Sequence, residues 1–392
     1  MCDHQFSAGT FVCATCLEDE ALQRFANEHG DTRQCDYCGN TPTSLSVVPL
    51  DDVTEFMARA IAEEWCDPVQ TAPYCSAEGE YQVETFENHE LFERIGFEVS
   101  NDRLMDDLLA AFADHDWCEV NWQILSPSKR WSAAWRRFER VIKHERRFTF
   151  WYSDDDDESP GHPDHLPPSQ MLNELQAVIN NSGLVNQLRV GTAMWRVRCH
   201  DQGTVLADPH HFTSPPVEFA TQPNRMSPAG VPMFYAAADF ETAFEEVVDL
   251  NDLGRNKIAS GGQFVNCIPL NVLDLTAIPA RPSYFAPDGP FNRHIIQFLK
   301  TFAEIVSQPI RRDGRPHIEY VPTQVFTEFV RHVMKGPQSV PVHGIKFASS
   351  RNGRDCYVIF ATAANCLPIP PHATESQLLE FVLGSIKTIS IP

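Results

Sequence analysis

Two cysteine pairs near the start of the chain constrain its fold more than any other feature. Cys13 and Cys16 form one Cys-x2-Cys pair, Cys35 and Cys38 form a second, and 18 residues separate the pairs. Four thiolates at this spacing are typical of a structural Zn²⁺ site, in which two short turns close a tetrahedron around the ion. Between the pairs, residues 17–30 have the pattern of a short amphipathic helix. Because four sulfur ligands leave no open position, we expect this zinc to support the fold and not to catalyse.

The segment after the cysteine pairs is predicted to be helical. Apolar residues recur at helical spacing in residues 53–65, 88–95 and 102–112. A further helix has apolar residues at i, i+4, i+7 and i+11 from Trp131, and it runs into the basic stretch 143–148. We therefore expect residues 1–152 to form a zinc-binding helical domain.

An acidic, proline-rich stretch separates this domain from the rest of the chain. Residues 153–169 read SDDDDESPGHPDHLPPS. Such a segment cannot bury apolar surface, so we predict an exposed linker and place the domain boundary there. Residues 170–392 mix strand-like runs, as in 192–199 and 264–275, with helical patterns, as in 292–306. The sequence thus predicts an α+β protein with a second domain of mixed α/β structure.

Composition restricts the compartment and the partners. The formal net charge is −22, and so acidic a surface repels phosphate backbones, which argues against nonspecific nucleic-acid binding. The chain has no run of about 20 apolar residues and no signal-like start, so we expect a cytoplasmic protein that does not span a membrane. The twelve cysteines are spread over the chain, which favours reduced thiols and metal binding over a disulfide framework.

Residues 223–246 combine a loop, a short strand and a helix in one compact stretch. The loop leads into an apolar run that contains Tyr235, and Asp239 can cap the helix that follows. From Phe240 onward, apolar residues recur at i, i+3, i+4, i+7 and i+8, the stripe of a packed helix. Such an element would bring Arg225, Tyr235 and a glutamate to the opening of one cleft. The alternative is an ordinary strand–helix junction with charged residues on its surface.

A second candidate feature lies on the predicted strand 192–199. Arg196 and Arg198 are two residues apart, so they share one face of the strand. In a cleft, such a pair would bind a diphosphate, because guanidinium groups pair bidentately with phosphate oxygens. On an edge strand the same face would only be solvated.

Several motifs of the second half, in their order and spacing, resemble the RES domain. They are Asn224-Arg225, Ser227-Pro228, Gly230, Tyr235-Ala236, Thr242-Ala243 with Glu246, Pro322-Thr323-Gln324, and the stretch 343–349. The resemblance covers about residues 185–365, and the N-terminal third resembles the domain found ahead of RES and HEPN domains. Characterised RES proteins are toxins that destroy NAD, and their fold is similar to that of ADP-ribosyltransferases. The resemblance therefore implies NAD as the substrate and this fold for the second domain.

The resemblance also implies the catalytic carboxylate and the family's serine. Glu246 matches the family's glutamate, whose role near the ribose would be to balance an oxocarbenium-like transition state. Helix geometry alone does not distinguish Glu246 from Glu245. Ser349 matches the family's last motif, with Ser350 as the alternative, and it would position the ribose, a phosphate or water.

The remaining site residues follow from the same resemblance. Arg225, with Arg196 or Arg198, would bind the diphosphate of NAD. Tyr235 would stack on the nicotinamide or hold a ribose hydroxyl. The sequence does not decide whether water, phosphate or a protein side chain accepts the ribosyl group. The family favours consumption of free NAD, by a glycohydrolase or a phosphorylase, over protein ADP-ribosylation.

Two other functions are compatible with parts of the sequence. A zinc-helical interaction module whose RES-like domain has lost turnover would bind partners without catalysis. A ribonuclease would use Arg137 and His144, which fit the loose R-x4-6-H pattern of HEPN enzymes, although the acidic charge disfavours RNA. Because an active NAD-degrading enzyme would poison its host, we also expect an inhibitor, either a separate antitoxin or the N-terminal domain. The sequence leaves the oligomeric state open, and a homo-oligomer is one of the assemblies it allows.

Overall fold

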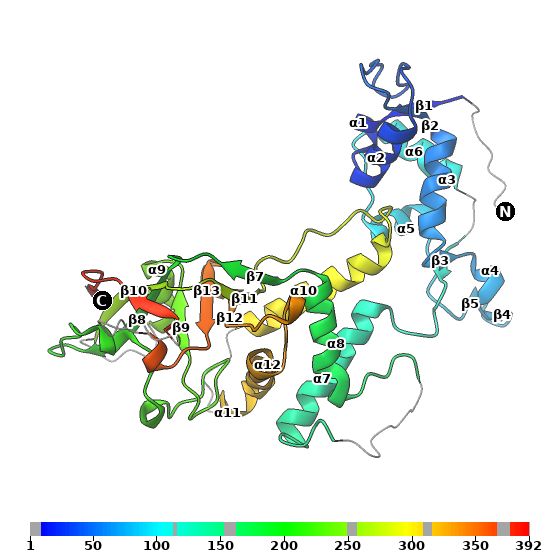
Figure 1. Ribbon diagram of the computed structural model, residues 1–392. Helices are drawn as coiled ribbons and strands as arrows, with labels where there is room; N and C mark the ends of the chain where they lie inside the picture. The colour runs from blue at the N-terminus through cyan, green and yellow to red at the C-terminus, as the bar shows by residue number, and fades with distance from the viewer. Residues whose placement is uncertain are drawn as a thin grey trace. The chain divides into compact units, whose positions relative to one another are not determined.

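The chain folds into two compact units in the computed structural model (Figure 1), which describes residues 9–112, 116–152, 162–248, 257–308, 316–366 and 377–391. The first unit comprises residues 1–130 and 280–297, and the second comprises 131–279 and 298–392. Residues 153–161 of the predicted linker lie outside the described residues. The domain boundaries drawn from the sequence, 1–152, 153–169 and 170–392, stay a prediction.

The first unit begins with the two cysteine turns and a short two-stranded sheet. The elements are β1 (Phe11–Cys13), α1 (Ala14–Leu17), α2 (Glu20–His29) and β2 (Val47–Pro49). β1 and β2 pair antiparallel, and the side chain of Asp19 caps α2. At Gly30, directly after α2, a Cβ atom would lie 2.4 Å from the carbonyl oxygen of Ala26. Glycine is therefore required where the backbone passes this close to the last turn of the helix. The helix predicted between the cysteine pairs is confirmed.

The other elements of the first unit are mostly short helices. They are α3 (Leu50–Ile61), β3 (Trp65–Cys66), α4 (Pro68–Thr71), β4 (Tyr74–Cys75), β5 (Glu80–Tyr81), α5 (Asn88–Ile95), α6 (Asp102–Ala111) and β6 (Cys118–Glu119). The apolar faces of α3, α5 and α6 meet in one core, in which Met57, Leu91 and Leu108 are fully buried. The helix predicted over residues 53–65 begins and ends earlier than expected, because α3 spans Leu50–Ile61 and Trp65 pairs with Glu119 in a β-ladder.

A segment distant in sequence completes the first unit. Within residues 280–297, Ser283 donates a hydrogen bond of 2.7 Å to Asp19, and Tyr284 donates one of 3.1 Å to Glu64. Phe285 lies in the same apolar core, edge-on to Phe97. No sequence pattern predicted this insertion, because it rests on side-chain contacts across more than half of the chain.

The second unit is organised around one mixed sheet. In the described residues nine strands pair in the order β14-β10-β8-β9-β13-β12-β11-β7, with β15 also pairing with β10. The strands are β7 (Val185–Leu188), β8 (Ala193–Asp201), β9 (Phe234–Ala237), β10 (Lys257–Asn266), β11 (Leu270–Asp274), β12 (Gly344–Ala348), β13 (Asp355–Ile359), β14 (Leu379–Phe381) and β15 (Lys387–Ser390). Only β11 and β12 pair in parallel among these described strands, so the sheet is predominantly antiparallel.

The second unit also contains helices, of which α9 and α12 pack against strands of the sheet. They are α8 (Pro168–Asn181), α9 (Phe240–Val247), α11 (Pro316–Glu319) and α12 (Val321–His332), with the short 3₁₀ turns η1 (Pro209–Phe212), η2 (Val217–Phe219), η3 (Pro337–Ser339) and η4 (Ala363–Asn365). α7 (Pro127–His144) and α10 (Gly289–Ser307) begin in the first unit and continue in the second. Within the second unit, Phe302 of α10 packs edge-on against Trp135 of α7 and Phe326 of α12.

This architecture confirms the predicted α+β class. The first unit is mainly helical and carries the cysteine turns, and the second unit pairs a mixed sheet with helices. Across the described parts of the chain, every helix is too short or too polar to cross a bilayer.

Candidate functional site

The four predicted metal ligands come together in the first unit. The Sγ atoms of Cys13, Cys16, Cys35 and Cys38 all lie within 4.8 Å of one another. The Sγ–Sγ distances are 3.6 Å for Cys13–Cys16, 3.7 Å for Cys13–Cys38 and 3.9 Å for Cys16–Cys35. Four sulfurs about 2.3 Å from one tetrahedral ion would lie about 3.8 Å apart. The tetra-cysteine cluster therefore fits a four-coordinate metal ion such as zinc.

The electrostatics of the cluster also suit a cation. Burial raises the pKa of the Cys13 and Cys16 thiols, and the neighbouring thiols add to the rise at Cys16. At Cys38, a hydrogen bond from the backbone N–H of Asn40 lowers the pKa to about 7. Because metal ligation requires thiolates, a bound cation would supply the positive charge that four adjacent sulfurs need.

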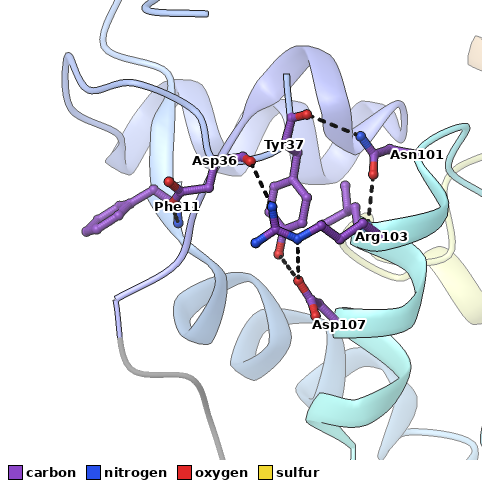
Figure 2. A network of polar contacts seen from close by, with 7 residues as sticks. Phe11, Asp36, Tyr37, Asn101, Arg103 and Asp107 are labelled. Carbon is purple, nitrogen blue, oxygen red and sulfur yellow. Dashed lines mark hydrogen bonds and ion pairs between the residues drawn. The ribbon is translucent and has the colours of Figure 1, made fainter. Parts of the chain in front are cut away.

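A network of polar contacts ties the second cysteine turn to α6 (Figure 2). Tyr37, which lies between Cys35 and Cys38, donates a hydrogen bond of 2.9 Å from its hydroxyl to Oδ2 of Asp107. Its backbone oxygen accepts from Asn101, and the oxygen of Asp36 accepts from Arg103. The turn that presents half of the ligands is therefore held by a helix some 70 residues further along the chain.

A cavity of about 430 Å³ lies in the second unit, at the place where β8, β9 and β13 meet α9. Its polar and charged lining residues are Arg196, Gln222, Asn224, Arg225, Ser227, Tyr235, Glu246, Tyr320, Ser350, Arg351 and Tyr357. Four residues predicted for the site, Arg196, Arg225, Tyr235 and Glu246, therefore share one cavity.

The structure distinguishes the two glutamates at the end of α9. Glu246 lines the cavity, and its Oε1 accepts a hydrogen bond of 2.5 Å from the Ser349 hydroxyl. Glu245 is exposed and accepts a hydrogen bond of 2.8 Å from Asn352. Ser349 is 4% exposed, whereas the exposed Ser350 lines the cavity. The geometry thus pairs Glu246 with Ser349 and places Ser350 beside that pair.

Arg225 lies on the loop between β8 and β9, close to the end of α10. Its guanidinium donates hydrogen bonds to the carbonyl oxygens of Val306 (3.2 Å) and Ser307. Burial lowers the pKa of Arg225, and the charge of Glu246 opposes this effect. The loop therefore presents a partly buried cation next to the cavity carboxylate.

Tyr235 lines the same cavity from β9. Its hydroxyl lies 2.9 Å from the Ser227 hydroxyl, within hydrogen-bond distance. Burial raises the pKa of Tyr235 to about 12, so the phenol is neutral at physiological pH. A neutral hydroxyl both donates and accepts, as a residue that holds a sugar hydroxyl must.

The two arginines of β8 have different surroundings. Arg196 lines the cavity, donates a hydrogen bond of 2.8 Å to the backbone oxygen of Tyr235, and lies over the ring of Phe234. Burial, and then the charge of Arg198, lower the pKa of Arg196 to about 10. Its buried Nε atom has no hydrogen-bond partner in the described part of the chain. Arg198 instead donates to the carbonyl oxygen of Thr213 and is outside the set of lining residues.

The loop of Arg225 is held by a motif whose role the sequence did not reveal. Gln324 donates hydrogen bonds of 2.8 and 3.3 Å to the backbone oxygens of Asn224 and Ser227. The Thr323 hydroxyl donates to the backbone oxygen of Arg225. This Thr-Gln pair lies in the first turn of α12, which begins at Val321. Tyr320 and Arg351 also line the cavity and were not predicted as site residues.

These features define a class of protein: an α+β domain in which a mixed sheet and one short helix surround a cavity with a carboxylate, a neutral tyrosine and several arginines. A family model for the RES domain matches residues 193–382, and one for HEPN/RES N-terminal domain 1 matches residues 28–156. The chain is therefore a RES-domain protein with an HEPN/RES N-terminal domain, which confirms the family resemblance. No curated protein and no solved structure matches it.

Proposed function

We propose that the RES domain cleaves the nicotinamide N-glycosidic bond of NAD and acts as a toxin or defence effector by depleting NAD. The RES match is consistent with an NAD-related function. The observation that carries the proposal is the pairing of Glu246 with Ser349 at a cavity that also contains Arg196, Arg225 and Tyr235.

The chemistry of this bond needs few catalytic groups. NAD carries a cationic nicotinamide, which leaves as a neutral ring with the electrons of the C–N bond, so no general acid is required. The ribosyl group becomes oxocarbenium-like, and a carboxylate beside it stabilises the developing positive charge. We assign this role to Glu246, because it is the glutamate that lines the cavity. Ser349 would orient the carboxylate through its hydrogen bond.

The cations and the tyrosine are proposed to bind the rest of the substrate. Arg225 and Arg196 would pair with the diphosphate, because guanidinium groups bind phosphate oxygens bidentately. Arg196 suits this role better than Arg198, because Arg196 lines the cavity and has a buried nitrogen available for a hydrogen bond. Tyr235 would stack on the nicotinamide or hold a ribose hydroxyl.

The acceptor of the ribosyl group decides the type of enzyme. Water would give ADP-ribose, the product of a glycohydrolase, and inorganic phosphate would give ADP-ribose-1″-phosphate, the product of a phosphorylase. A protein side chain as acceptor would make the enzyme a protein ADP-ribosyltransferase, which is the alternative we retain. The family resemblance favours the first two.

We further propose Zn²⁺ as the ion of the tetra-cysteine cluster, with a structural role. The spacing of the sulfur atoms and the all-sulfur ligand set support this choice. An enzyme that consumes NAD requires an inhibitor, which would be a separate antitoxin or the N-terminal domain. The alternative of a different class is a non-catalytic interaction module built on the zinc-helical domain.

The test of the proposed function is NAD loss by the full-length, zinc-loaded protein, with and without inorganic phosphate. Nicotinamide release in both buffers identifies a glycohydrolase, and release that needs phosphate identifies a phosphorylase. Label transfer from NAD to protein would identify the transferase instead. Intact NAD in all three assays, from folded protein, would contradict NAD cleavage and leave the interaction module.

A further inference from the structure

The turn that carries Ser349 is held against α9 by residues outside the cavity. Nδ2 of Asn352 donates hydrogen bonds of 3.1 Å to the Thr242 hydroxyl and 2.8 Å to Oε2 of Glu245. Two residues further on, Arg354 forms an ion pair of 3.4 Å with Asp239. All three partners belong to α9 or to its N-cap. The turn thus contacts the helix at the cap and at its exposed glutamate.

The turn itself is closed by its own hydrogen bonds. The backbone N–H of Ser349 donates to the oxygen of Arg354 (2.7 Å), and that of Gly353 donates to the oxygen of Ser349 (2.8 Å). The N–H of Arg351 donates to the Ser349 hydroxyl, and the N–H of Arg354 donates to Oδ1 of Asn352. Gly353 has a φ of +75°, which glycine adopts without strain. Because the turn is internally bonded, whatever holds Asn352 also holds Ser349.

Two adjacent residues of α9 contact this one turn. Successive residues of a helix point about 100° apart, so Glu245 and Glu246 cannot face the same direction. Glu245 contacts Asn352 on the exposed side, and Glu246 contacts Ser349 at the cavity. A displacement of the turn along α9 would therefore break both contacts together.

We infer that Glu245 and Asn352 are positioning residues, which hold the turn so that the Ser349 hydroxyl meets the Glu246 carboxylate. The expected effect on kcat rests on the proposed function, whereas the position of the turn rests on the hydrogen bonds described above. Neither residue lines the cavity, so neither touches the substrate there. Their loss should lower kcat and leave KM for NAD nearly unchanged, because the Ser349 hydroxyl would no longer orient the Glu246 carboxylate, whereas Arg196 and Arg225 lie outside this turn.

A pair of substitutions tests this contact without removing the side chains. Asn352→Asp puts a second carboxylate against Glu245, and like charges at hydrogen-bond distance repel. We expect kcat to fall about tenfold, with KM within about twofold of the native value. Adding Glu245→Gln places an amide opposite the new carboxylate. The side chain at position 245 then donates the hydrogen bond, and the side chain at position 352 accepts it. We expect the double variant to recover to within about threefold of the native kcat.

Glu241→Gln is the matched control, because Glu241 is an exposed glutamate in the first turn of the same helix. It should leave kcat unchanged. A native kcat in Asn352→Asp, or a double variant no faster than that single variant, would overturn the inference. A purely structural role would lower the melting temperature of Asn352→Asp while the folded variant keeps the native kcat.

Failure of the proposed function is recognised separately, because the native protein would then leave NAD intact. In that case, hydrogen exchange at the backbone N–H groups of Ser349 and Gly353 tests the same contact. Faster exchange in Asn352→Asp, with recovery in the double variant, supports the positioning role. Equal exchange in the native protein and Asn352→Asp overturns it.

Discussion

The cysteine cluster of the first unit and the cavity of the second unit are built over very different lengths of chain. The four sulfur ligands lie between Cys13 and Cys38, in one turn-helix-turn segment. The cavity joins β8, the loop of Arg225, α9 and the turn after β12, so Arg196 and Ser350 are more than 150 residues apart. The first site has a fixed ligand set that one short segment can supply. The second exists only when the sheet has formed.

This difference predicts how each site fails. A closed tetra-cysteine site stabilises its own fold, so loss of one ligand should be a stability defect. The cavity contains charged groups that are partly desolvated at a cost to stability, such as Arg196, whose Nε atom is buried, so loss of one group should be a functional defect. The predictions below test this contrast, beginning with the largest expected effect.

Removal of the metal should unfold the cysteine segment. Structural zinc contributes on the order of 10 kcal/mol to small zinc domains, far more than any single side-chain contact. We expect Cys35→Ser, or treatment with a chelator, to lower the melting temperature markedly and to release one equivalent of metal. Metal analysis and thermal unfolding measure this. An unchanged unfolding curve after complete metal release would show that the cluster does not hold the fold.

Glu246→Gln should abolish most of the NAD turnover without unfolding the protein. The substitution keeps the size of the side chain and removes the charge that would stabilise the ribosyl transition state, a loss of at least about 100-fold in kcat. Single-time-point and steady-state assays of nicotinamide release measure it. Glu241→Gln on the same helix is the control, and native turnover in Glu246→Gln would refute the assigned role.

Arg225→Lys should weaken substrate binding more than it affects chemistry. Lysine keeps the charge but loses the planar fork that binds two phosphate oxygens, so we expect KM for NAD to rise about tenfold. Because Arg225 also donates to the carbonyl oxygens of Val306 and Ser307, the melting temperature must be measured in parallel. Arg189→Lys, at an exposed position, is the control. An unchanged KM would remove Arg225 from the diphosphate site.

Tyr37→Phe should produce a small loss of stability. It removes the hydrogen bond to Asp107, which joins the second cysteine turn to α6, and such bonds contribute about 1 kcal/mol. Thermal or denaturant unfolding of the zinc-loaded protein measures the change. Tyr74→Phe is a matched control, because Tyr74 is 55% exposed. Equal stability of both variants would mean that the Tyr37–Asp107 hydrogen bond adds nothing to the stability that the metal provides.

The smallest expected effect is the pH dependence of substrate binding by Arg196. Because its pKa is lowered to about 10, the side chain is cationic below that pH and loses its charge above it. KM for NAD should stay constant between pH 7 and 9 and rise about fourfold by pH 10.5. The folded state disfavours this charge, so its loss should not unfold the protein, which circular dichroism checks. A constant KM up to pH 10.5 would argue against a diphosphate contact.

Local patterns predicted the elements of both sites well. The Cys-x2-Cys spacing predicted a cluster that forms, and the capping Asp239 with the apolar repeat from Phe240 predicted α9. The alternation of β8 placed Arg196 and Arg198 on one face. The alternation did not predict that Arg196 lines the cavity while Arg198 donates to Thr213. The surroundings of the two side chains depend on segments that are distant in the sequence.

By itself, the sequence determined the ligands of the cysteine cluster, the helices and strands with regular apolar spacing, and the RES family, because each depends on residues close together in the chain or on their order. The tertiary structure decided which of two adjacent glutamates meets the cavity, which serine it pairs with, and that Thr323 and Gln324 hold the loop of Arg225. These outcomes depend on hydrogen bonds between segments about 100 residues apart, whose geometry is fixed only when the sheet and its helices pack.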